Sequence, residues 1–66
     1  MSRPPQSDGY IVEYVAIGTS VKVTAFDPAT LTEASIVAPS GASQQDMAQL
    51  AVRKLEYVLG KKQAGE

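Results

Sequence analysis

Residues 10–27 read YIVEYVAIGTSVKVTAFD, and this stretch decides the fold. One set of its apolar residues recurs at every second position, at 12, 14 and 16 and again at 21, 23 and 25, which is the spacing of a strand with one buried face. Between residues 43 and 59 the apolar residues recur at every third or fourth position, which is the spacing of an amphipathic helix. This change of period predicts strands first and one helix last.

Gly18-Thr19 divides the quoted stretch into two strands. A two-residue loop with glycine first suits a type II′ turn, because glycine takes a positive φ without strain. This turn pairs Ile17 with Ser20. The pairs that then share one face are Ala16–Val21, Tyr14–Val23 and Val12–Ala25. A shift of one residue would place Glu13 on that apolar face, so the sequence favours the unshifted register.

Residues 27–30, Asp-Pro-Ala-Thr, predict a second turn of type I. Asp at the first position can accept a backbone hydrogen bond, and Pro fixes φ at the second. If Asp27 faces Thr32 across this turn, a third strand adds the pairs Ala25–Ala34, Val23–Ile36 and Val21–Ala38 on the same face. Because two separate turns agree on one apolar face, we expect an antiparallel meander with residues 21–26 as its central strand.

The segment after the third strand predicts the helix. Ser43 is the expected N-cap, with Asp46 three residues later as in a capping box. The apolar stripe expected to face the sheet consists of Met47, Leu50, Ala51, Leu55 and Val58. We expect the helix to end at Gly60, with Lys61 and Lys62 near the negative end of its dipole.

Together these elements predict an α+β domain of two layers, with the order β-β-β-α and the helix on one face of the sheet. The core face is rich in small residues that let the helix lie close, namely Ala16, Ala25, Ala34 and Ala38. We expect residues 1–9 to be a disordered arm, residues 10–60 to be the domain, and residues 61–66 to be a frayed tail.

Composition limits the chemistry that this chain can carry. Its 66 residues have a formal net charge of −1, no cysteine and no histidine, and its 7 acidic residues are scattered singly. Disulfides are excluded, and zinc sites and Ser-His nucleophiles lack their usual residues. We therefore expect no enzyme activity, no cofactor and no metal. The polar N-terminus lacks the apolar core of a signal peptide, so we expect a cytoplasmic protein that does not span a membrane.

The outer face of the predicted sheet is the candidate partner-binding surface. Phe26 is the only phenylalanine, and it points away from the predicted core, opposite Ile11. On the helix, Val52 and Leu59 lie at the edge of an apolar arc of roughly 220°, where we expect exposure. Scattered apolar residues are also normal on a solvated face. The residues expected to bind a protein partner or a second copy are Phe26, Ile11, Val15, Val37, Lys22, Val52 and Leu59.

A second interpretation uses the basic end of the helix. Four of the 6 basic residues lie there and could contact an anion or a nucleic acid, namely Arg53, Lys54, Lys61 and Lys62. The same charges suit a solvated face that complements the helix dipole, and Glu56 partly cancels them. Nucleic-acid binding is therefore the alternative function, and a protein-interaction module remains the first, since the chain has no basic excess.

Three strings resemble a family of short uncharacterised proteins from α-proteobacteria, and the likeness covers about residues 10–60. They are residues 21–28 (VKVTAFDP), 32–37 (TEASIV) and 53–59 (RKLEYVL). This resemblance implies a small cytoplasmic bacterial protein and brings no activity, cofactor or site residue. The β-β-β-α order is also similar to that of HicB-like antitoxins, although Gly18-Thr19 and Pro28 match that family's turns only in part.

Overall fold

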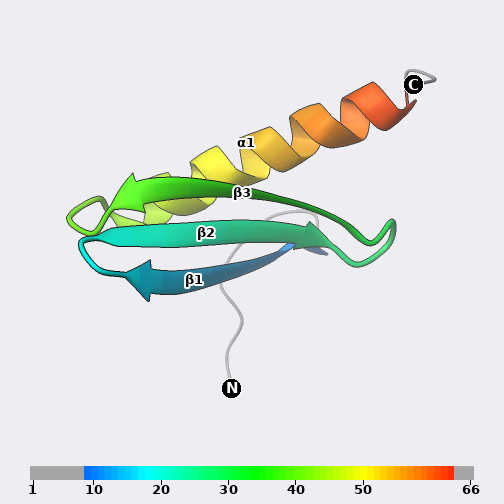
Figure 1. Cartoon of the computed structure of the whole chain (residues 1–66). Coiled ribbons are helices and arrows are strands. Elements are labelled where there is room, and N and C mark those ends of the chain that lie inside the picture. The colour runs from blue at the N-terminus through cyan, green and yellow to red at the C-terminus, as the bar shows by residue number, and fades with distance from the viewer. Residues whose placement is uncertain (1–8, 64–66) are drawn as a thin grey trace.

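The computed structural model describes residues 9–63, and the side chains of residues 62 and 63 lie outside this description. The elements are β1 (Ile11–Ile17), β2 (Ser20–Asp27), β3 (Thr32–Pro39) and α1 (Gln44–Gln63). The sheet is antiparallel in the order β1-β2-β3, and α1 packs on one of its faces (Figure 1). The predicted α+β fold is confirmed. The arm expected at residues 1–9 lies, except for Gly9, outside the described residues, and so do residues 64–66 of the expected frayed tail.

Both predicted strand registers are confirmed. Ile17 lies opposite Ser20 in the first hairpin, and Asp27 lies opposite Thr32 in the second. Gly18 has a φ of 60°, and among the described residues other than glycine only Leu31 has a positive φ. Thr19 therefore has an ordinary φ, and the first turn has the sign pattern of type II′.

Asp27 accepts a backbone hydrogen bond in the second turn, as the sequence predicted. Its Oδ1 accepts a hydrogen bond from the N–H of Ala29 at 3.0 Å, and its carbonyl oxygen accepts one from Leu31 at 2.8 Å. The hydroxyl of Thr30 donates to Oδ2 of the same carboxylate at 3.0 Å. Leu31 takes a φ of 60°, which is uncommon for leucine, and its side chain is exposed at the tip of the loop.

Ser43 is the N-cap of α1. Its Oγ accepts a hydrogen bond from the N–H of Asp46 at 3.0 Å, which satisfies one of the free donors of the first turn. The expected end at Gly60 is wrong, because α1 continues to Gln63. The sequence after Gly60 is Lys-Lys-Gln, whose residues favour helix, so a single glycine does not stop it. Residues 61–63 therefore belong to the helix and not to a frayed tail.

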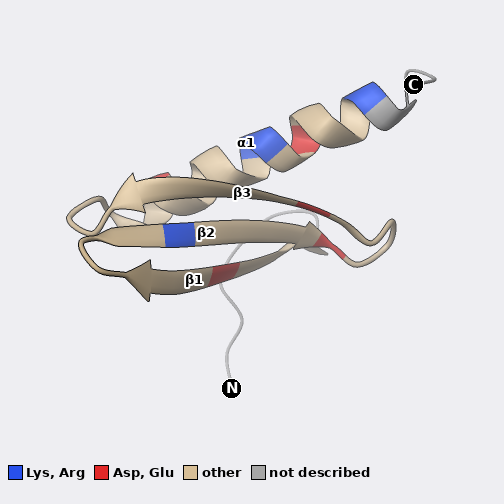
Figure 2. Ribbon diagram, viewed as in Figure 1, with Lys and Arg blue, Asp and Glu red and all other residues tan. Residues whose placement is uncertain are grey.

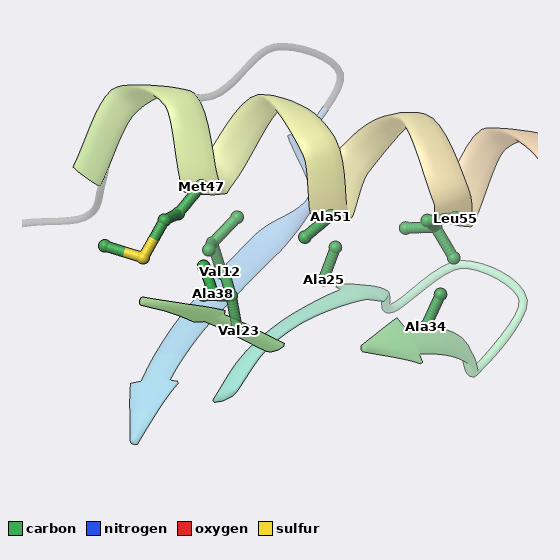
Figure 3. Close-up of a cluster of buried hydrophobic side chains, with 8 residues drawn as sticks. All are labelled: Val12, Val23, Ala25, Ala34, Ala38, Met47, Ala51 and Leu55. Carbon is green, nitrogen blue, oxygen red and sulfur yellow. The ribbon is translucent and has the colours of Figure 1, made fainter. Parts of the chain in front are cut away.

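The core lies between α1 and the inner face of the sheet, which is the face that α1 covers. Figure 3 shows the helix side chains pointing at the sheet. Ala25 and Ala51 are both 0% exposed, so small residues on the two layers allow a close approach. The buried apolar side chains are Val12, Val23, Ala25, Ala34, Ala38, Met47, Ala51 and Leu55.

Two residues expected in the core are exposed. Ala16 is on the inner face by its pairing with Val21, but α1 packs mainly over β3 and β2 and touches β1 least, so Ala16 is left uncovered. Leu50 is 51% exposed because α1 is rolled about its axis away from that side. The opposite flank, which holds Val52 and Leu59, packs against the core.

Candidate partner-binding site

The outer face of the sheet, opposite α1, has no described helix or strand over it (Figure 1). Cross-strand neighbours on this face form rows, because alternate residues of each strand point the same way. From the Gly18-Thr19 turn outward, the rows are Ile17–Ser20–Pro39, Val15–Lys22–Val37, Glu13–Thr24–Ser35 and Ile11–Phe26–Glu33.

Apolar side chains gather at both ends of the outer face. Ile17, Val15 and Val37 are 56%, 52% and 69% exposed near the first turn, and Ile11 is 41% exposed at the other end. Phe26 is half-buried beside Ile11 and is not among the residues packed on the core. The predicted outward direction of Phe26 is confirmed, while its binding role stays a prediction.

A polar row separates these two apolar ends. Thr24 and Ser35 share a hydrogen bond between their hydroxyl groups at 2.8 Å, with Glu13 next in the row. Lys22 lies between Val15 and Val37, where its aliphatic stem can cover apolar neighbours while its ammonium stays in water. Figure 2 shows this basic segment of β2 near the acidic segment of β1. The face can therefore offer apolar contact at two places and polar contact between them.

The sequence predicted the exposed apolar margin on the wrong side of the helix. Val52 and Leu59 are half-buried against the core. The wide apolar arc predicted from the sequence has two edges, and the sheet covers the Val52 edge. The exposed edge holds Leu50 and Tyr57, which are 51% and 66% exposed.

The basic residues of α1 are partly engaged within the molecule. The Nζ of Lys54 donates to the carbonyl oxygen of Ser35 at 2.8 Å, and the Nζ of Lys61 lies 5.7 Å from the centre of the Tyr57 ring. Arg53 is exposed, and the side chain of Lys62 lies outside the description. An acidic segment interrupts the basic ones along α1 (Figure 2). The four residues therefore offer no single basic platform.

Comparison with known families gives one match. A family model described as a domain of unknown function, DUF6898, matches residues 7–63. The chain belongs to this family. The match includes all three strands and the helix, so the outer face described above is part of the DUF6898 domain. No curated protein and no solved structure matches the chain.

Within the described part of this DUF6898 domain, no three His, Cys, Asp or Glu side chains are placed to hold a metal ion. None of its described helices is long and apolar enough to cross a membrane.

Sequence reasoning missed several exposed apolar residues of the DUF6898 domain. Ile17 belongs to the outer face, and the predicted register already placed it there. Leu50 and Tyr57 follow from the roll of α1, which no sequence signal fixed. They share a flank with Lys54, and because Lys54 reaches Ser35, this flank lies along the free edge of β3.

Proposed function

We propose that this DUF6898 domain is a non-catalytic protein-interaction module that docks a partner on the outer face of its sheet. One observation carries the proposal: four aliphatic side chains on this face are between 41% and 69% exposed, one of them beside the half-buried Phe26 and three at the other end of the face. A two-layer domain needs only one apolar sheet face to fold, so the other face is usually polar. Apolar residues that gather on an open face are typical of interaction sites.

Phe26 and Ile11 form the proposed anchor. They are cross-strand neighbours, and a partly buried aromatic ring loses little conformational entropy when a partner covers it. Val15 and Val37, on either side of Lys22, supply a second contact. The hydroxyl groups of the central row can orient the partner by hydrogen bonds.

Phe26→Ala tests the proposal, with Leu50→Ala as a matched control. Both variants remove a large apolar side chain outside the buried core, one on the sheet and one on the helix. We expect Phe26→Ala to weaken association by about 2 kcal/mol or more while circular dichroism shows an intact fold. Proteins captured from native lysate by wild type and by Leu50→Ala, but lost with Phe26→Ala, would support outer-face docking. Equal capture by both variants would contradict it.

The alternative is a nucleic-acid-associated or antitoxin-like protein, supported by the β-β-β-α order and the basic residues of α1. This alternative would be favoured if the domain binds nucleic acid and the binding falls steeply with salt. Arg53→Glu should then reduce the binding, and Phe26→Ala should leave it unchanged. We also propose a cytoplasmic location in an α-proteobacterium, on the sequence likeness alone.

A further inference from the structure

The two edges of the sheet are protected differently. On β3, the ammonium of Lys54 binds the carbonyl of Ser35, and Pro39 has no N–H to offer. On β1, no proline and no lysine interrupts the sequence IVEYVAI. Within the described part of the chain, β1 pairs with β2 alone. Natural proteins protect edge strands with lysine, proline or short length, and an unprotected edge is a template for another strand.

The hydrogen-bonding direction of β1 follows from the registers. Ser40 donates its N–H to the carbonyl of Thr19, whereas the carbonyl of Ser35 points away from β2 and accepts from Lys54. Because this direction alternates along a strand, the backbone groups of the even-numbered residues of β3 bond to β2. Alternation across the sheet then directs the odd-numbered residues of β1 toward β2. The N–H and C=O groups that point to the free edge belong to Val12, Tyr14 and Ala16.

We propose that two copies of this chain pair through β1, antiparallel and about a two-fold axis at Tyr14, to form one continuous six-stranded sheet. Tyr14 is the middle residue of β1 (Ile11–Ile17), so this register pairs the whole strand with its copy. Tyr14 lies opposite Tyr14 of the second copy, and Val12 lies opposite Ala16 of the second copy. All these residues direct their backbone groups outward, so each pair can exchange two hydrogen bonds.

The outer-face side chains favour a second copy in this register. Ile11 meets Ile17 of the second copy, and Glu13 meets Val15 of the second copy, so no like charges are directly opposed. Lys22, which neighbours Val15, lies in the same row as Glu13 of the second copy. Two strand spacings separate their Cα atoms by about 9.6 Å, a span that these long side chains can bridge. A register centred on Glu13 would oppose two carboxylates.

The inner face of β1 has room for the second copy. Ala16 is exposed and Tyr14 is half-buried there, because α1 lies mainly over β3 and β2. The hydroxyl of Tyr14 donates to the carbonyl of Gln44 at 3.2 Å, which fixes the ring beside the proposed axis. Pairing would cover Ala16 with Val12 of the second copy and would bring the two Tyr14 rings together.

The assembly stops at two copies. Pairing through β1 leaves two β3 edges at the ends of the six-stranded sheet, and each is protected by Lys54 and Pro39. The outer face stays open and brings Ile11 of one copy beside Ile17 of the other. The pairing does not rest on the proposed docking function, since it uses backbone groups at the edge.

Substitution of Ala16 tests the pairing by light scattering after size exclusion, over a concentration series. Proline is tolerated on an edge strand where the N–H faces outward, so Ala16→Pro should keep β1 on β2 and remove one edge donor. We expect wild type and the control Ala16→Val to reach twice the 7.0 kDa monomer mass with rising concentration. Ala16→Pro should stay monomeric, and Phe26→Ala should dimerise like wild type.

Cysteine substitution tests the register and does not depend on a proline variant. The chain has no cysteine, so a single Tyr14→Cys change gives one defined thiol. The Cα atoms at Tyr14 would lie about 5.5 Å apart, within disulfide range, whereas those at Glu13 would be about 8 Å apart and out of range. We expect oxidation to link Tyr14→Cys much faster than Glu13→Cys. A strictly monomeric wild type, a dimer of Ala16→Pro or equal linking at both positions would overturn the proposal.

Discussion

Both faces of this sheet carry apolar residues, but only the inner face is covered by α1. The inner face presents Val23, Ala25, Ala34 and Ala38, and all are buried under α1. The outer face presents aliphatic residues and Phe26, and it has no second layer among the described elements. Small residues on the inner face let a helix approach closely. Burial in this domain therefore follows from where the helix can pack, and hydrophobicity alone does not decide it.

Leu55→Ala, on the covered side of the sheet, should cause the largest loss in the free energy of unfolding. Leu55 is 0% exposed, and removing a buried leucine side chain costs about 2–5 kcal/mol. A single core of this size supplies roughly 3–5 kcal/mol in total, so we expect a largely unfolded variant. The control Val37→Ala changes a side chain that is 69% exposed, and it should shift stability by less than about 0.5 kcal/mol. Urea titrations followed by circular dichroism compare the two, and equal losses would contradict the contrast.

Ala25→Leu should have the next largest effect, through overpacking. Ala25 and Ala51 are both 0% exposed, so added methylene groups must push α1 away from the sheet at a cost of about 1–3 kcal/mol. Ala16→Leu adds the same atoms on the same face where α1 does not cover it, so it should be tolerated. Thermal melts at matched concentration measure the difference. A tolerated Ala25→Leu would mean that close approach is not required.

The sequence was sufficient to predict which residues share a face. Turn chemistry at Gly18-Thr19 and Asp27 fixed both registers, and strand alternation then placed Val23 inward and Phe26 outward. The sequence could not predict how far α1 extends over β1, and for this reason Ala16 was expected in the core.

The roll of α1 is the second feature that the sequence left open. An apolar arc wider than the sheet needs can be buried at either edge, and helical periodicity does not choose between them. The structure buries the Val52 edge and leaves Leu50 exposed. Lys54 bonded to Ser35 is consistent with this roll, and a contact between residues so far apart in sequence has no local signal. The candidate outer face was predictable because the turns fixed the strand registers. The exposed helix margin was not predictable, because it depends on the roll of α1.

Ser43→Ala should weaken the helix that covers the inner face. The lost hydrogen bond from Asp46 to the Ser43 hydroxyl leaves a free donor in the first turn, which costs about 1 kcal/mol. Ser40→Ala is the matched control, because the Ser40 hydrogen bond to Thr19 uses the backbone N–H and survives the change. Urea midpoints of the two variants should separate. Equal midpoints would mean that the Ser43 cap does not stabilise α1 on the sheet.

Gly60→Ala should have the smallest effect, and it should stabilise the domain. α1 passes through Gly60, and an added Cβ there meets no heavy atom within 4 Å. Alanine in a helix interior is favoured over glycine by about 0.5–1 kcal/mol, so helicity and the urea midpoint should both rise. Gly18→Ala is the matched control, since its Cβ is equally free of contacts but its φ is 60°. Alanine is strained at that φ, so this variant should lose stability. A loss at Gly60 as well would mean that the last turns of α1 need the freedom of glycine, and the inner face would then be covered only by the helix before Gly60.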